Sequence, residues 1–222
     1  MNAKTHDERR AAAIQLGLHG DYKKFEFYEG TFTDKFFRCC EGKIVVDCGM
    51  CYGYYTALAL RAGAKHVYGF EPNEPLHGPH LKKEFGSNDR VTLCFKALTN
   101  RAGTLQLLTR PGTLRSWSAT KQIVMTRGNP NKTKVESVDV PCTTIDANAF
   151  ENVDVIKCDT EGGEATIFHG AQRVLKNKPS IFLELHRIGV KATDRLSQLF
   201  KAHGYTPDLA GSTPGRFILE AQ

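Results

Sequence analysis

The stretch IVVDCGMCYGYYTALALRAGAKHVYGFEPN, residues 44–73, decides the fold of this chain. It opens on a short β-branched run, which predicts a buried strand, and Gly49 and Gly53 then bracket a tight turn. Residues 54–61 follow a helical period that stops before Gly63, and residues 66–70 form a second strand-like run. This order of strand, glycine turn, helix and strand predicts the start of a parallel α/β sheet.

The turn and the acid that follows it predict a nucleoside ligand. The turn reads Asp47-x-Gly49-x-x-x-Gly53, and Glu71 closes the second strand 18 residues after Gly53. Such a turn lets a ligand lie against bare backbone, and an acid at the tip of the next strand can accept both ribose hydroxyls. Because the carboxylate of Asp47 would repel a pyrophosphate, we expect S-adenosylmethionine, with its ammonium and sulfonium, rather than a dinucleotide. A plain βαβ unit without a ligand is the remaining interpretation.

The cysteines allow a competing interpretation of the same turn. Cys48-Gly49-Met50-Cys51 is a C-x-x-C at a strand-to-helix junction, as in thioredoxin-like proteins, but redox activity would leave Asp47 and Glu71 without a role. Seven cysteines, an odd number, favour a reducing compartment. Because the sequence has no second C-x-x-C and no Cys/His cluster, we expect no metal site. No apolar run approaches the ~18 residues of a membrane helix, so we expect a soluble, cytoplasmic protein.

Charge is unevenly distributed along the chain. The net charge is +6, yet residues 90–135 hold nine Lys or Arg and no Asp or Glu, so the remainder is 3 negative (9 − 6 = 3). Such a segment is a candidate face for an anionic acceptor, including nucleic acid, or simply a solvated basic loop. Within it, Arg115, Trp117 and Lys121 are the expected acceptor-binding residues.

The rest of the chain predicts one α/β domain over residues 1–222. We expect a helical segment at 1–42 that is either a lid or packing, and a core at 43–222 with a basic insertion at about 99–140. Its sheet should be doubly wound, of about seven strands and mostly parallel, with helices on both faces and an antiparallel C-terminal edge. Further strands are expected at 91–95, 153–158, 180–185, 205–209 and 216–220, with 104–108 and 136–140 as edge strands. Helices are expected from Asn73 to Gly86, over the apolar stripe at 167, 168, 171, 174 and 175, and from Thr193 to Gly204.

A second motif carries a family resemblance. Asp159-x-Glu161-Gly162-x-Glu164, followed by Gly170-Ala171, Pro179 and Glu184-x-His186, resembles the FkbM family of S-adenosylmethionine-dependent methyltransferases over about residues 44–205. The resemblance implies a class I Rossmann-like fold, methylation of hydroxyl oxygens of sugars and related metabolites, and Asp159 beside the methionine end of the cofactor. Cys51 and Tyr52 depart from the small or polar residues usual in that turn. The expected cofactor-binding residues are Asp47, Gly49, Met50, Cys51, Tyr52, Gly53, Glu71, Pro72, Asn73, Lys96, Ala97 and Asp159.

The predicted reaction is O-methylation of a small metabolite, sugar or lipid-like acceptor. An alcohol needs its proton removed, and the candidate catalytic residues are His186, Asp159 and Glu161, with His186 preferred because its ordinary pKa suits a base at neutral pH. Glu161 and Glu164 also fit as charges at a helix N-terminus. The alternatives are an RNA ribose 2′-O-methyltransferase that uses the basic segment, and a binding module without catalysis. The sequence predicts no oligomeric state.

Overall fold

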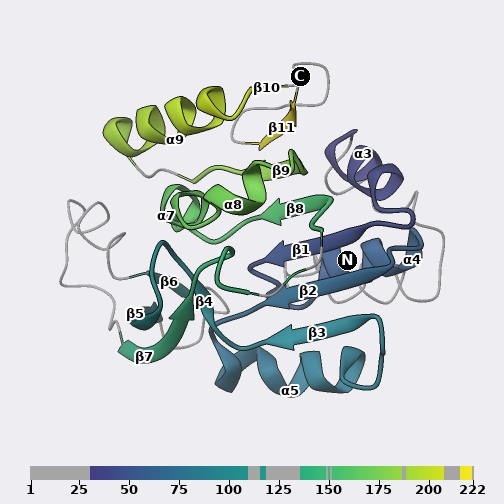
Figure 1. Ribbon diagram of the computed structural model, residues 1–222. Coiled ribbons are helices and arrows are strands. Elements are labelled where there is room, and N and C mark those ends of the chain that lie inside the picture. Colours follow the sequence, from purple (N-terminus) through teal and green to yellow (C-terminus); the bar gives the residue numbers. More distant parts are fainter. Residues whose placement is uncertain are drawn as a thin grey trace, which may run out of the picture.

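The structure, a computed structural model, describes residues 31–109, 116–118, 136–148, 150, 152–186, 189–207 and 216–221. Within these ranges a seven-stranded sheet runs in the order β10-β11-β9-β8-β1-β2-β3 (Figure 1). Its strands are β1 (Ile44–Cys48), β2 (His66–Phe70), β3 (Val91–Cys94), β8 (Val155–Cys158), β9 (Ser180–Glu184), β10 (Tyr205–Pro207) and β11 (Arg216–Ala221). Strands β3, β2, β1, β8 and β9 are parallel, and β11 pairs antiparallel with β9 and β10. The predicted α/β class with a mixed, mostly parallel sheet is confirmed.

Helices cover both faces of this sheet. On one face lie α3 (Thr31–Cys39), α4 (Tyr54–Arg61) and α5 (Glu74–Phe85), and on the other lie α7 (Glu164–His169), α8 (Gln172–Leu175) and α9 (Val190–Ala202). Neighbouring strand residues face opposite ways, so Val45 packs in the first core and Val46 in the second. This double coverage explains why the central strands read as continuous apolar runs. No helix in the described ranges is both long enough and apolar enough to cross a membrane.

Helix α3 belongs to the core of the protein. Phe32 and Phe36 meet the ring of Phe182 in β9 edge-on, with ring centroids 5.5 and 5.2 Å apart. Both phenylalanines are fully buried, so this part of the expected helical segment packs against the sheet. The preceding part of this expected segment, residues 1–30, lies outside the described residues, so the alternative of a lid stays untested there.

Two expected helices differ in detail from the structure. The stripe from 167 to 175 was expected on one helix, but the chain turns at Gly170 and Ala171 and forms α7 and α8. Gly170 lies so close to the backbone of Thr99 that a Cβ there would collide with the carbonyl oxygen. Helix α9 begins at Val190 rather than Thr193, because Gly189 is its N-cap and the Thr193 hydroxyl donates to the Gly189 carbonyl.

The segment expected to hold edge strands forms a sheet of its own. Its strands are β4 (Ala97–Leu98), β5 (Gly103–Thr109), β6 (Ser116–Ser118) and β7 (Glu136–Thr143). Strands are present at the expected 104–108 and 136–140, but they are not edge strands, because β7 and β5 are the two central strands of this small sheet. They pair with each other from Gly103 with Cys142 to Thr109 with Glu136. In Figure 1 the arrowheads of β1, β2, β3 and β8 point toward this small sheet. It therefore stands beside the edge where ligands bind in doubly wound folds.

We predict that Gly53 tolerates no side chain. It starts α4 at φ 78°, and a Cβ there would collide with the ring of Phe85 in α5. Gly53→Ala should lower the free energy of unfolding by the cost of a left-handed alanine, about 1 kcal/mol, plus about 1–3 kcal/mol for overpacking. Urea unfolding monitored by circular dichroism measures this loss.

Gly42→Ala is the matched control for this prediction. Gly42 has a similar φ of 69° but no atom within 4 Å of its Cβ position, so it should lose the conformational part alone. Equal losses for the two variants would show that packing against Phe85 does not matter.

Candidate functional site

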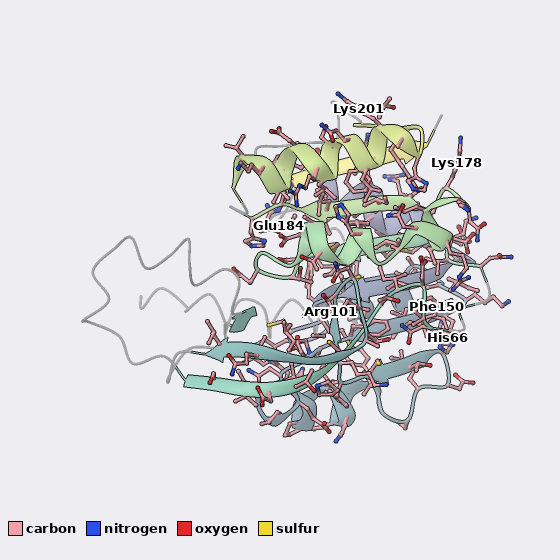
Figure 2. All side chains as sticks on the ribbon, turned by 60° about the vertical axis from the view of Figure 1, so that its left-hand side comes forward. His66, Arg101, Phe150, Lys178, Glu184 and Lys201 are labelled. Carbon is pink, nitrogen blue, oxygen red and sulfur yellow. The ribbon has the colours of Figure 1, made fainter. Side chains whose placement is uncertain are left out.

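A cavity of about 220 Å³ opens at the carboxyl ends of the parallel strands. Its walls come from residues 49–52 after β1, residues 70–72 at the end of β2, residues 96–98 after β3, and residues 159–161 after β8. Glu184, His186 and Arg216 close one side, and Leu105 and Leu107 of the small sheet close another. Figure 2 shows Glu184 at the end of the sheet opposite His66 and Lys178. All of these segments converge because parallel strands end at one edge.

Most of the residues expected at the cofactor site line this cavity. They are Gly49, Met50, Cys51, Tyr52, Glu71, Pro72, Lys96, Ala97 and Asp159. Three others have structural positions instead. Asp47 is buried in β1 and accepts the Thr56 hydroxyl at 2.7 Å, Gly53 packs on Phe85, and Asn73 caps α5 by accepting the Leu76 N–H.

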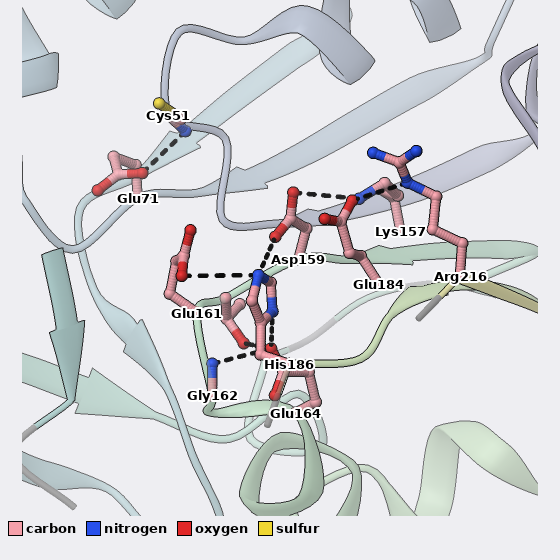
Figure 3. A network of polar contacts seen from close by, with 11 residues as sticks. Cys51, Glu71, Lys157, Asp159, Glu161, Gly162, Glu164, Glu184, His186 and Arg216 are labelled. Atoms are coloured by element: carbon pink, nitrogen blue, oxygen red, sulfur yellow. Dashed lines mark hydrogen bonds and ion pairs between the residues drawn. The ribbon is translucent and has the colours of Figure 1, made fainter. Parts of the chain in front are cut away.

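Glu71 is a fixed and buried carboxylate at the tip of β2. Its Oε2 accepts the backbone N–H of Cys51 at 2.8 Å (Figure 3), and its Oε1 accepts that of Asn73 at 2.9 Å. Burial raises the pKa of Glu71 above its ordinary value, although the two N–H donors act against this shift. Cys51 adopts φ 52°, a left-handed conformation that costs a non-glycine residue about 1–2 kcal/mol. The strained turn delivers the Cys51 N–H to Glu71 and so joins the loop after β1 to the end of β2.

Gly49 brings the loop after β1 against the loop after β8. It has φ 87°, and a Cβ there would collide with the carbonyl oxygen of Asp159. The Asp159 N–H also donates to the Cys48 carbonyl at 3.0 Å. The backbone of Asp159 therefore packs against the glycine turn, and its side chain lines the same cavity as Gly49.

His186 stands among three carboxylates (Figure 3). Its Nδ1 lies 2.9 Å from Glu164 Oε1, and its Nε2 lies 3.7 Å from Asp159 Oδ1 and 3.6 Å from Glu161 Oε2. Burial lowers the pKa of His186, but the hydrogen bond to Glu164 and the charges of Asp159, Glu164 and Glu161 outweigh it, so the pKa lies above its ordinary value. The three residues expected to be catalytic, His186, Asp159 and Glu161, are thus brought together.

A buried lysine forms an ion pair with one of the acids near His186. Lys157 of β8 is 1% exposed, its Nζ lies 3.8 Å from Asp159 Oδ2, and it sits 4.3 Å from the centroid of the Tyr55 ring. It also neighbours Asp47 across the β1–β8 pair. Burial raises the pKa of Asp47 to about 6, against the lowering effects of the Thr56 hydroxyl and of Lys157. Lys157 is therefore the internal cation that offsets the buried Asp47 and the partly buried Asp159.

Four residues of the site were not predicted as functional residues. Glu184 and Glu164 belong to the quoted motifs, so the sequence signal existed, and Lys157 lies two residues before Asp159 in the same segment. Arg216, whose Nε donates to Glu184 Oε2 at 3.1 Å, comes from the distant strand β11 and has no local signal. Only the pairing of β9 with β11 brings it to the cavity.

Asp159, Glu184 and His186 also offer ligand atoms within 4.8 Å of one another, a spacing that a metal ion could occupy. Two of these groups already have cationic partners, since Glu184 pairs with Arg216 and Asp159 with Lys157. The imidazole of His186 also has a partner, since its Nδ1 lies 2.9 Å from Glu164 Oε1. We therefore assign no metal to this cluster.

The other sequence predictions fall partly outside the described residues. Arg115 and Lys121 lie outside them, and Trp117 lies in β6, where it pairs with Leu108 through the backbone. All seven cysteines are free. Cys48 is buried in the core beside Cys158, whereas Cys51 faces the cavity, so the two ends of the C-x-x-C lie in different surroundings.

Comparison with known proteins identifies the family. The Methyltransferase FkbM domain matches residues 47–207, which is most of the chain. The chain belongs to this family. No curated protein matches the sequence. The predicted resemblance to FkbM methyltransferases is therefore confirmed.

Solved structures support the fold of this FkbM domain. The methyltransferase FkbM from Methylobacillus flagellatus superposes with a TM-score of 0.55 at 16% identity, over 96% of this chain and 59% of that chain. A candidate rRNA methylase from Clostridium thermocellum superposes with a TM-score of 0.51 at 13% identity, over 87% of this chain and 95% of that chain. At such identities the likeness concerns the fold alone. The chain spans little more than half of the Methylobacillus protein.

We predict that Lys157 is required for stability at neutral pH. Lys157→Met removes the cation between Asp47 and Asp159, and leaving buried charge unpaired should cost about 3–5 kcal/mol at pH 7. Without Lys157 the pKa of Asp47 rises further above its unfolded value, so the penalty is fully present above that pKa and is relieved as the acid protonates. Because Asp47 has a pKa of about 6 in the wild type, the deficit should shrink as the pH falls through the higher pKa of the variant and should be largely gone by about pH 6. Urea unfolding across a pH series measures this change.

Lys43→Met serves as the surface control. Lys43 Nζ lies 3.6 Å from Asp154 Oδ1, but the lysine side chain is 48% exposed, so its loss should cost less than about 1 kcal/mol. A deficit for Lys157→Met that does not vary with pH would contradict the assignment of its charge.

Proposed function

We propose that this FkbM domain transfers a methyl group from S-adenosylmethionine to a hydroxyl oxygen of a small acceptor, such as a sugar, another metabolite or a lipid-like alcohol. One observation carries the proposal. The fixed carboxylate of Glu71 and the cluster of Asp159, Glu161 and His186 line the same cavity, with the Gly49 turn between them. The Glu71 end of the cavity suits a ribose. The end with Asp159 and Glu161 suits a cation, and it also holds His186, which can take up a proton.

The lining fits the cofactor in charge and in shape. Glu71 holds two backbone N–H groups, and the remaining lone pairs of its oxygens suit the two ribose hydroxyls. Gly49 lines the cavity, and its lack of a side chain lets the backbone of Asp159 close on the turn, which brings that carboxylate to the same cavity. Asp159 supplies a carboxylate for the ammonium and sulfonium end. Lys96 and Ala97, after β3, border the region proposed for the adenine.

His186 is the proposed base. When bound, the cofactor would supply a methyl group on sulfonium, whose carbon–sulfur bond breaks toward sulfur as the acceptor oxygen forms its bond to carbon. His186 Nε2 would take the hydroxyl proton, which requires the neutral imidazole. Because its pKa is raised by the surrounding carboxylates, we expect kcat/KM to rise with pH through a value above that of an ordinary histidine.

The charge of the cavity favours a neutral or cationic acceptor. Asp159, Glu161 and Glu184 line the side where the acceptor would enter, where Arg216 is paired with Glu184, and Leu105 and Leu107 add an apolar wall. The other lining cation, Lys96, lies on the side proposed for the adenine. Carboxylates in this position would repel a phosphate and can accept hydrogen bonds from hydroxyls. A small hydroxylated molecule therefore fits better than RNA.

We predict that Glu71→Gln weakens binding of S-adenosylmethionine about 100-fold in calorimetry, because an amide cannot accept two ribose hydroxyls while also holding both backbone N–H groups. Hydrogen bonds to a charged group contribute about 1.5–3 kcal/mol each, so one lost bond accounts for a factor of about 10–100. Glu74→Gln is the control, since Glu74 lies only three residues away on α5 and pairs with Lys82 at the surface. Affinity that stays within threefold of wild type in a folded Glu71→Gln variant would exclude the proposed ribose site.

We further predict that labelled S-adenosylmethionine transfers its methyl group to small hydroxylated metabolites rather than to RNA. A cell extract separated into RNA and small-molecule fractions would be incubated with the protein, and the products treated with alkali. Label should stay in the small-molecule fraction as an ether, which alkali does not cleave, whereas a methyl ester would be lost. Label in RNA would instead favour ribose methylation, and tight cofactor binding without transfer to either fraction would favour a binding module.

A further inference from the structure

The most completely buried acid of the site makes no contact with the cavity. Glu164 is 0% exposed and is absent from the lining, yet its Oε1 lies 2.9 Å from Nδ1 of His186. The same oxygen accepts the Gly162 N–H at 2.9 Å and faces the Thr160 hydroxyl at 3.5 Å. Figure 3 shows Glu164 on the side of the imidazole away from Asp159. Glu164 thus holds the back of the ring, while Nε2 faces the cavity.

The turn before α7 gives Glu164 this position. Glu161 and Gly162 both have left-handed backbone, with φ 54° and 109°, and the chain then enters the helix at Gly163. This reversal sends Glu161 to the Nε2 side of the ring and Glu164 to the Nδ1 side. A helix N-terminus favours an acid, but that effect alone would allow Glu164 to point into solvent.

Charge balance supports a specific pairing of Glu164 with His186. Burying a carboxylate is costly unless it is paired and hydrogen-bonded. Oε2 of Glu164 is buried without a hydrogen-bond partner in the part of the chain that the structure describes. The other oxygen, Oε1, lies 2.9 Å from His186 Nδ1, so the imidazole is the titratable side chain in contact with this buried carboxylate.

We propose that Glu164 is a positioning residue that fixes the ring and the tautomer of His186, so that Nε2 carries the free lone pair that faces the acceptor. This inference rests on the proposed function, in which His186 is the base. A carboxylate accepts hydrogen bonds and donates none, so the ring nitrogen that faces it must carry the proton. In the neutral ring, Nδ1–H donates to Glu164 and the lone pair lies on Nε2.

The Glu164–His186 pair determines which ring nitrogen takes the proton of the acceptor hydroxyl. The acceptor hydroxyl gives its proton to Nε2 as its oxygen bonds to the methyl carbon, and the electrons of the carbon–sulfur bond stay on sulfur. The resulting imidazolium is stabilised by Glu164 at Nδ1, which keeps its proton throughout. Removing Glu164 should thus affect the base and leave the cofactor contacts at Glu71 and Gly49 intact.

Several other charged side chains of the described residues lie near His186. Their effects on its titration must be distinguished from the effect of Glu164. Asp159 and Glu161 lie near Nε2, Glu184 of β9 lies within 4.8 Å of the same group of atoms, and Lys157 and Arg216 pair with Asp159 and Glu184. Glu161→Gln is the matched control, because it removes one negative charge at 3.6 Å without touching Nδ1.

The test combines histidine NMR with kinetics. In ¹⁵N-histidine-labelled wild type, with the His186 signal assigned by its loss in His186→Gln, the neutral ring should carry its proton on Nδ1. Glu164→Gln, which keeps the oxygen acceptor but removes the charge, should move the His186 titration to lower pH by more than Glu161→Gln does. The acid limb of kcat/KM should move in the same direction.

Glu164→Met, which removes the acceptor, should release the tautomer and lower kcat by about 100-fold while cofactor affinity stays within threefold of wild type. A wild-type neutral ring protonated on Nε2, or equal titration shifts in Glu164→Gln and Glu161→Gln, would overturn the proposal. The wild-type tautomer is informative even if Glu164→Met does not fold. Failure of S-adenosylmethionine to bind wild-type protein would refute the proposed function, whereas the NMR result tests the Glu164–His186 pair independently.

Discussion

The close approach of two backbone loops is the constraint on which the site depends. Gly49 touches the carbonyl of Asp159, and the Asp159 N–H donates to Cys48 next to it. Any side chain at position 49 would separate the loop after β1 from the loop after β8. The first loop carries the Cys51 N–H that holds Glu71, and the second carries the acids around His186. A single glycine in the left-handed region therefore brings the two halves of the cavity together.

The second constraint is electrostatic. The cavity and the layer below it concentrate carboxylates, and the internal cations Lys157, His186 and Arg216 hold three of them in ion pairs. Such an arrangement is costly to fold, because each buried charge loses its hydration. It suits a ligand that brings its own positive charge, since a sulfonium would find acids already oriented. The neighbouring carboxylates raise the pKa of His186 above its ordinary value despite its burial, whereas the raised pKa of Asp47 comes mainly from burial.

The small sheet gives the cavity its individual character. Strands β5 and β7 form a long antiparallel pair beside the carboxyl ends of the main sheet, and Leu105 and Leu107 reach the cavity from it. The fold is similar to that of the FkbM protein of Methylobacillus flagellatus over 96% of this chain. The two leucines make one wall of the cavity apolar, in contrast to the acids that the main sheet supplies.

The sequence by itself determined the main sheet and the half of the cavity formed by the glycine turn and Glu71, because both depend on local patterns. Strand β2, helix α4, the Asn73 cap and the Gly49 turn follow from apolar periodicity, capping chemistry and glycine, which act within a few residues. Tertiary structure decided the rest. It placed β5 and β7 in a sheet of their own. It divided the apolar stripe of residues 167–175 between two helices at Gly170, where Thr99 approaches. It also brought Arg216 to Glu184 and Lys157 to Asp159. These outcomes depend on contacts between segments far apart in the chain, whose energies a local pattern does not contain. The role of Glu164 is of the same kind: its place at a helix start was readable, but its partner His186 lies 22 residues away and meets it only because β8 and β9 are adjacent.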